Sequence, residues 1–172
     1  MNLESSVSPP GFQAVRRDQL RQEYEHDSYK SRYKPTEPSV CPDCGALFHA
    51  GRWQWDTPHA DAAEVVCPAC HRIRDHFPAG FLHVEGEFFT DHRNEVLALI
   101  RHHAEKERAE HALARIISIK EGNEAGDDKL LVTTTDIHLA RDLGEALHHA
   151  YRGQLDFHYN DAENLLRVHW QR

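Results

Sequence analysis

Four cysteines, the only ones in the chain, occur as two nearly identical tetrapeptides, Cys41-Pro-Asp-Cys44 and Cys67-Pro-Ala-Cys70. A Cys-x-x-Cys turn directs two thiolates toward one point, and two such turns separated by 22 residues can complete a tetrahedral metal site. Gly45 follows the first pair, where such a turn often needs a positive φ. The pattern therefore predicts a small zinc ribbon in which Cys41, Cys44, Cys67 and Cys70 bind one structural Zn²⁺ ion.

Redox and catalytic roles fit this pattern less well. A thioredoxin-like redox pair is usually single, so it would leave the second pair unexplained. A catalytic zinc keeps one position open for water or substrate, whereas four cysteines close the coordination shell. The chain lacks GxSxG, HExxH and phosphate-binding glycine motifs, and Asp136 is better explained as a helix cap than as a catalytic acid. We therefore expect a protein that is not an enzyme.

The charge balance limits the partners that the chain can bind. The 172 residues include 40% hydrophobic and 28% charged residues, as in a soluble globular protein, and the formal net charge is −8. This charge disfavours a broad electrostatic contact with nucleic acid, so any RNA contact has to be local. No apolar run approaches the roughly 18 residues that span a bilayer, and the first residues do not resemble a signal peptide. We expect a cytoplasmic monomer, in which thiols stay reduced.

The chain is also histidine-rich, with 15 histidines between His26 and His169. The ordinary pKa of histidine lies close to physiological pH, so mild acidification would reduce the net negative charge. Most of these side chains are expected simply to face solvent. If many do, their protonation predicts stronger RNA binding at mildly acidic pH.

Segments beside the cysteines carry candidate binding residues. In Gly51–Trp55, two tryptophans on one side of a β-like run either stack on a base or a protein partner, or form the core of the ribbon. The segment after the second pair has two arginines, which either contact phosphate or carboxylate groups or stay in a solvated loop. The candidate RNA- or partner-binding residues, including those of the N-terminal arm, are Arg52, Trp53, Trp55, His71, Arg72, Arg74, Arg16, Arg17, Lys30, Arg32 and Lys34.

The hydrophobic pattern divides the chain into four parts. Residues 1–38 predict a flexible arm in which only residues 15–30 favour a short helix. Residues 39–90 predict the ribbon, which ends in a turn and a strand at Phe81–Phe89. Residues 91–112 predict a connecting helix whose first half is amphipathic and whose second half is almost wholly charged.

Residues 113–172 predict a ββαββ domain. Two β-rich runs at 114–120 and 129–135 flank a loop of Gly, Asn and Asp, and alternating apolar residues at 154–160 and 164–170 predict a second pair of strands. Between the pairs, an amphipathic helix begins at the capping residues Thr135 and Asp136 and stops at Gly153.

The expected fold class is therefore α+β, with a small four-cysteine zinc ribbon joined by a helix to a ββαββ sandwich. A right-handed crossover gives an antiparallel sheet in the order 2-1-3-4. The face of this sheet opposite the helix would carry His158, Arg167 and His169 and be free for a partner.

The order of these parts resembles a known family. The resemblance lies in the order CPDCG, CPACH, PAGFLHVEGEF, a charged helix, and LLVTTTDIHLARDLGEAL before a terminal hairpin. In this order, residues 39–172 resemble the archaeal and eukaryotic large-ribosomal-subunit export adaptor (Nmd-type) zinc-ribbon family. The chain looks like a shortened, bacterial-type relative. Family members typically have more cysteine pairs and a long later region with transport signals, so export is not implied here. The resemblance implies association with the ribosome, on the large subunit near its tRNA exit region.

Two functional hypotheses follow from the sequence. The first is a non-catalytic zinc-ribbon protein that contacts rRNA and protein on the ribosome, in assembly, quality control or stress dormancy. The alternative is a protein-protein adaptor or regulator that binds no RNA.

Overall fold

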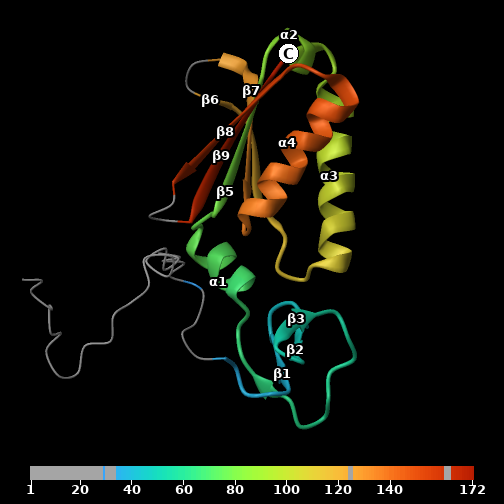
Figure 1. Cartoon of the computed structure of the whole chain (residues 1–172), viewed down its shortest axis with the longest axis vertical. Helices are drawn as coiled ribbons and strands as arrows, with labels where there is room; N and C mark the ends of the chain where they lie inside the picture. The colour runs from blue at the N-terminus through green and yellow to red at the C-terminus, as the bar shows by residue number, and fades with distance from the viewer. Residues whose placement is uncertain (1–28, 30–33, 124–125, 161–163) are drawn as a thin grey trace, which may run out of the picture.

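The chain forms two parts stacked along its long axis (Figure 1). The computed structural model describes residue 29 and residues 34–123, 126–160 and 164–172. We call residues 34–79, which contain the cysteines, the metal module, and the described residues from 80 to 172 the body. None of the described helices is both long and apolar enough to cross a membrane.

The metal module is built from very short elements. Its sheet has the strand order β3-β2-β1-β4, with β1 parallel to β4 and the other neighbours antiparallel. The elements are β1 (Ser39–Val40), β2 (Leu47–His49), β3 (Arg52–Gln54), β4 (Ala63–Glu64) and α1 (Pro68–Asp75). Strands of two or three residues bury little apolar surface, so a metal held by the cysteines would contribute much of the stability of this module.

The body contains a five-stranded sheet in the order β6-β7-β5-β9-β8. Its elements are β5 (Gly80–Glu85), α2 (Glu87–Asp91), α3 (Arg93–Glu110), β6 (Ile116–Asn123), β7 (Gly126–Thr134), α4 (Ile137–Tyr151), β8 (Gln154–Asn160) and β9 (Leu165–Gln171). Strands β5 and β9 are parallel, and all other neighbours are antiparallel. Because β7 lies between β5 and β6, the unit β5-α3-β6 is a split βαβ motif.

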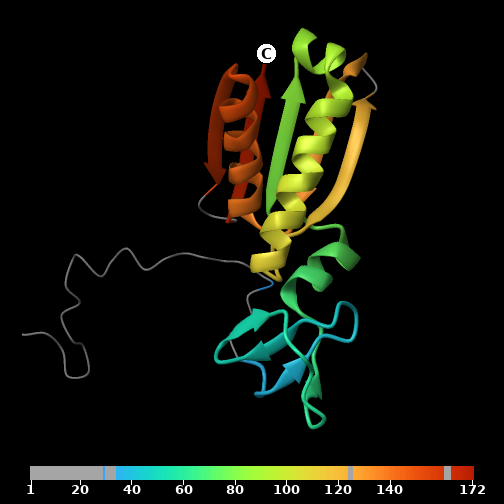
Figure 2. The ribbon, with the colours of Figure 1, turned by 90° about the vertical axis from the view of Figure 1, so that its right-hand side faces the viewer.

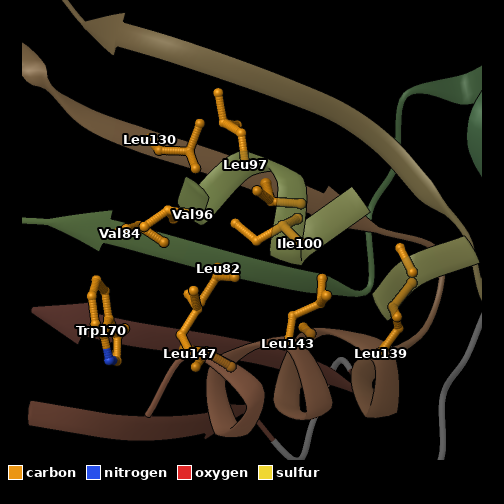
Figure 3. Close-up of a cluster of buried hydrophobic side chains, with 14 of the residues drawn as sticks. Leu82, Val84, Val96, Leu97, Ile100, Leu130, Leu139, Leu143, Leu147 and Trp170 are labelled. Carbon is orange, nitrogen blue, oxygen red and sulfur yellow. The ribbon is translucent and has the colours of Figure 1, made fainter. Parts of the chain in front are cut away.

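Helices α3 and α4 pack on the same face of this sheet, as the two views show (Figures 1 and 2). The core lies between them and the strands, where Leu82, Ile100, Leu143 and Trp170 are all fully buried (Figure 3). In the central strands every second residue enters this core, as in Leu82 and Val84 of β5. None of the described helices covers the opposite face of the sheet.

Several predictions from sequence are confirmed. The α+β class is correct, and the hairpin β6-β7, the helix α4 and the hairpin β8-β9 form in the predicted order. Asp136 caps α4, and its carboxylate accepts a hydrogen bond from the backbone N–H of His138 at 2.5 Å. The predicted inward residues of the last strand, Leu166, Val168 and Trp170, are fully buried.

The predicted sheet order 2-1-3-4 is wrong. The segment assigned to the ribbon at Phe81–Phe89 is instead the central strand β5 followed by the short helix α2, and β5 separates the two hairpins. Strand β5 pairs along both of its edges, with β7 and β9, and its side chains Leu82 and Val84 are completely buried. The charged helix α3 is likewise part of the body, because Val96, Leu97 and Ile100 belong to the same core.

Gly144 allows α4 to approach the sheet closely. A Cβ atom at this position would lie 2.5 Å from Cγ1 of Val168 and 3.1 Å from Cδ1 of Leu155. We predict that Gly144→Ala lowers the free energy of unfolding by about 1–3 kcal/mol, because overpacking outweighs the gain in helix propensity. Urea denaturation measures this change. The exposed control His149→Ala on the same helix should stay within about 0.5 kcal/mol, and a stabilised Gly144→Ala variant would contradict the packing argument.

Candidate metal centre

The first cysteine pair lies in a tight turn between β1 and β2. The backbone N–H of Cys41 donates to the carbonyl of Ala46, and the N–H of Gly45 donates to the carbonyl of Cys41, both at 2.8 Å. Gly45 has a φ of 77°, as the sequence predicted, and no atom lies within 4 Å of where its Cβ would be. Glycine is therefore favoured here by the backbone conformation rather than by lack of space.

The second pair does not form a matching turn, but begins the helix α1. Cys67 is the N-cap residue, and its sulfur accepts from the N–H of Cys70 at 3.4 Å. Pro68 occupies the start of the helix, where its fixed φ is favourable and its missing N–H costs nothing. The expectation of two equivalent ribbon turns is thus corrected to one turn and one helix start. The helix places its positive N-terminal end beside the thiolates, which stabilises their charge.

The four sulfur atoms gather at one point. All lie within 4.8 Å of one another, and Sγ of Cys44 is 3.8 Å from Sγ of Cys67. Tetrahedral Zn–S bonds of about 2.3 Å require sulfur separations of about 3.8 Å. Cys41, Cys67 and Cys70 are buried and Cys44 is half-buried. The arrangement is therefore compatible with one structural zinc, and no other group in the described part of the chain has such a geometry.

The thiols have strongly different affinities for protons. Burial raises the pKa of Cys41, but backbone N–H groups of Cys67, Cys44 and Asp43 outweigh this effect and lower it to about 7. The pKa of Cys67 is raised, first by burial and then by the nearby thiolates of the other three cysteines. Four clustered thiolates would therefore repel one another unless a cation lay among them, and a divalent metal ion would supply that charge.

Arg115, which no motif in the sequence singled out, contacts three of the four sulfur atoms. It precedes β6 in the body, and its guanidinium donates to Sγ of Cys44 at 3.0 Å, to Sγ of Cys70 at 3.3 Å and to Sγ of Cys67 at 3.7 Å. Its side chain is buried, with 7% of the residue exposed. One signal was visible in the sequence, since Arg115 is the only charged residue in the apolar run 112–117.

The body holds Arg115 firmly in this position. Its Nε donates to the carbonyl of Ala112 at 2.9 Å, and its backbone N–H donates to Oγ1 of Thr135 at 3.0 Å. Thr135 in turn donates to the carbonyl of Leu113 at 2.6 Å. Because four thiolates around Zn²⁺ carry two excess negative charges, a buried guanidinium directed at them is a charge-complementary partner.

Trp55 forms a second contact between the metal module and the body. Its indole N–H donates to the carbonyl of Arg108 at the end of α3, at 2.5 Å. The guanidinium groups of Arg108 and Arg115 lie 5.4 Å and 5.5 Å from its ring. Trp53 packs against Phe48 on the neighbouring strand β2, with ring centroids 5.4 Å apart. Of the two interpretations of these tryptophans, the structure therefore favours an internal packing role, most clearly for Trp55.

The other candidate binding residues fall into three groups. Arg72 faces inward, because only 4% of it is exposed, it donates to the carbonyl of Phe77 at 3.0 Å and its guanidinium lies over the ring of Tyr29. The exposed side chains are Lys34, Arg52, His71 and Arg74, of which Arg74 forms an ion pair with Asp43. The residues outside the described part of the chain are Arg16, Arg17, Lys30 and Arg32.

A groove lies between the metal module and the body. One wall carries Arg52, Trp53 and His71, and the other carries Glu107 and Asp142. Burial, followed by the neighbouring carboxylates of Glu107 and Glu145, raises the pKa of Asp142. The module side of the groove therefore contributes a cation and the body side carboxyl groups, of which Asp142 is protonated more readily than an ordinary aspartate.

Comparison with family models, curated proteins and solved structures found no match to this chain. The support for a metal centre is therefore the geometry of the four cysteines.

We predict that Arg115→Met weakens zinc retention by about 10- to 100-fold, because the variant removes the hydrogen bonds to the sulfur atoms. Arg115→Lys should lose less, since it keeps the charge but cannot direct a planar fork at separate sulfur atoms. Competition with a chromogenic chelator measures the affinity. Arg141→Met, which changes an exposed residue of α4, is the control and should match the wild type. Wild-type zinc affinity in Arg115→Met would show that the contact has no effect on the metal.

Proposed function

We propose that Cys41, Cys44, Cys67 and Cys70 bind one zinc ion whose role is structural. The observation that carries this proposal is the closed arrangement of four sulfur atoms, three of them in buried residues and three in contact with Arg115. When all four positions of a tetrahedral ion are occupied by cysteine, none is left for water or substrate. The metal then fixes the shape of the module and takes no part in a reaction.

From the family resemblance we further propose that the protein is a non-catalytic binding protein of the ribosome. Its contacts with rRNA and protein would be confined to local sites, because the whole chain is acidic. The metal would hold β3 and α1 in place, and these elements present the exposed residues Arg52, His71 and Arg74. Assignment to the large subunit, and to assembly, quality control or stress dormancy, rests on the family resemblance alone.

The groove between the two parts supports a second candidate function. A groove with basic and aromatic side chains on one wall and carboxylates on the other suits a polypeptide, which carries both charges and apolar groups. This favours the alternative of a protein-protein adaptor or regulator without RNA binding.

Sedimentation of cell lysate through a density gradient tests the ribosomal function. We predict that the protein migrates with the large subunit at low salt and is released at higher salt, because phosphate contacts are salt-dependent. Arg52→Glu should move the protein toward the top of the gradient, whereas Arg141→Glu, on the exposed side of α4, should not.

Failure to sediment with ribosomes at low salt, in both growing and stressed cells, would contradict this function. Recovery of one protein partner without RNA in a pull-down would instead support the adaptor.

A further inference from the structure

We propose that the helix-free face of the five-stranded sheet binds single-stranded RNA through Phe81, His83, Arg167 and His169. This inference rests on the RNA contact in the proposed function and assigns it to a surface of the body, separate from the metal module. All four residues lie on β5 and β9, the two parallel strands near the middle of the sheet.

Strand register places the side chains of this face in two rows that cross the whole sheet. One row is Ser118, Thr133, Phe81, Arg167 and His158, in the strand order β6-β7-β5-β9-β8. The next row is Lys120, Leu131, His83, His169 and Asp156. Directly paired residues share a face, so these side chains stand together opposite the core residues Leu82 and Val168.

Flat ring systems gather in the middle of these rows. The imidazoles of His83 and His169 are stacked, with centroids 4.6 Å apart and planes 5° apart, and His158 meets His169 edge-on at 5.7 Å. The guanidinium of Arg167 lies 5.4 Å from the centre of the Phe81 ring. Phe81, His83 and His169 are all half-buried, so each ring is held by its neighbours and yet reaches the surface. Held rings of this kind are the surfaces on which unpaired bases stack.

The charge of this face suits a phosphate backbone, although the whole chain is acidic. The row that contains Phe81, Arg167 and His158 has no carboxylate, and Lys120 stands in the next row. Of the two acidic residues paired into this face, Glu85 forms an ion pair with Lys129 at 2.9 Å. Asp156, at the edge strand β8, accepts from the neutral amide of Gln154 at 2.8 Å and keeps its negative charge. Among the described residues, no carboxylate forms an ion pair with Arg167, whose side chain is exposed. Arg167 and Lys120 therefore provide local cationic groups for phosphate on a chain of net charge −8.

The protonation of His83 is consistent with stacking. Burial, followed by the nearby His169 and Arg167, lowers the pKa of His83. Its ring is therefore neutral at neutral pH and presents a π surface without adding a charge.

A single strand of RNA fits this surface better than a protein or a duplex. The fully buried centre of a protein interface is usually apolar, whereas the middle of this face combines the Phe81 ring with two imidazoles and a guanidinium. A duplex keeps its bases stacked within the helix, so it cannot place them on these rings.

Fluorescence anisotropy with a labelled oligouridine of about 12 nucleotides tests the proposal. We expect the full-length protein to bind it, and Phe81→Leu, which keeps an apolar side chain but removes the ring, to bind at least about fivefold more weakly. Arg167→Gln should weaken binding at low salt and reduce the slope of log K against log salt by about one.

The charge-matched control Arg141→Gln, on the helix-covered side of the sheet, should bind like the wild type. Thermal unfolding confirms that each variant is folded.

Three results would overturn the proposal: no binding of the oligouridine by wild-type protein, equal binding of duplex RNA, or unchanged affinity in folded Phe81→Leu and Arg167→Gln. The density gradient separates this failure from failure of the ribosomal function. If the oligouridine experiment gives one of these results while the wild type still migrates with ribosomes, the sheet face is excluded and the ribosomal function stands. If the wild type binds the oligouridine but not ribosomes, the sheet face stands and the ribosomal function fails.

Discussion

The guanidinium of Arg115 connects the two parts of this protein through sulfur. It belongs to the body, where Ala112 and Thr135 hold it, and it donates to cysteines of the metal module that come from both pairs. A buried arginine is costly unless its charge is compensated, and here the compensation comes from thiolates. Because a bound metal would keep the cysteines as thiolates, metal binding and the docking of the module on the body would be linked. Trp55 adds a neutral contact at the same boundary.

The topology of the body leaves one face of its sheet without a covering helix among the described residues. Strand β5 lies in the middle of the sheet, and α3 and α4 both cover the face that contains Leu82 and Val84. The apolar residues of the central strands therefore face the helices, and the other side of the sheet carries rings, amides and charged groups of both signs. The metal module lies beyond one end of this sheet (Figure 2), so the two candidate binding surfaces are distinct.

The sequence was sufficient for features that depend on local pattern. The cysteine cluster, the turn at Gly45 and the capped helix α4 follow from spacing, backbone preference and amphipathicity. The position of β5 in the sheet could not be predicted. Alternating apolar and polar residues show that one face of a strand is buried, but they do not show which strands pair with it. The inward role of Arg72 was missed because a basic residue after a cysteine pair resembles a surface contact until Tyr29 and Phe77 are seen around it. Arg115 was missed because its partners lie 45 and 71 residues away in the sequence.

The central claim is that four cysteines close the coordination shell of one zinc ion. X-ray absorption spectroscopy at the zinc edge, on protein purified without chelator, tests it most directly. The account predicts one zinc ion per chain with four sulfur neighbours at about 2.3 Å and no nitrogen or oxygen bound to the metal. A zinc ion with fewer sulfur neighbours and a bound water, or protein that contains no stoichiometric zinc, would contradict it.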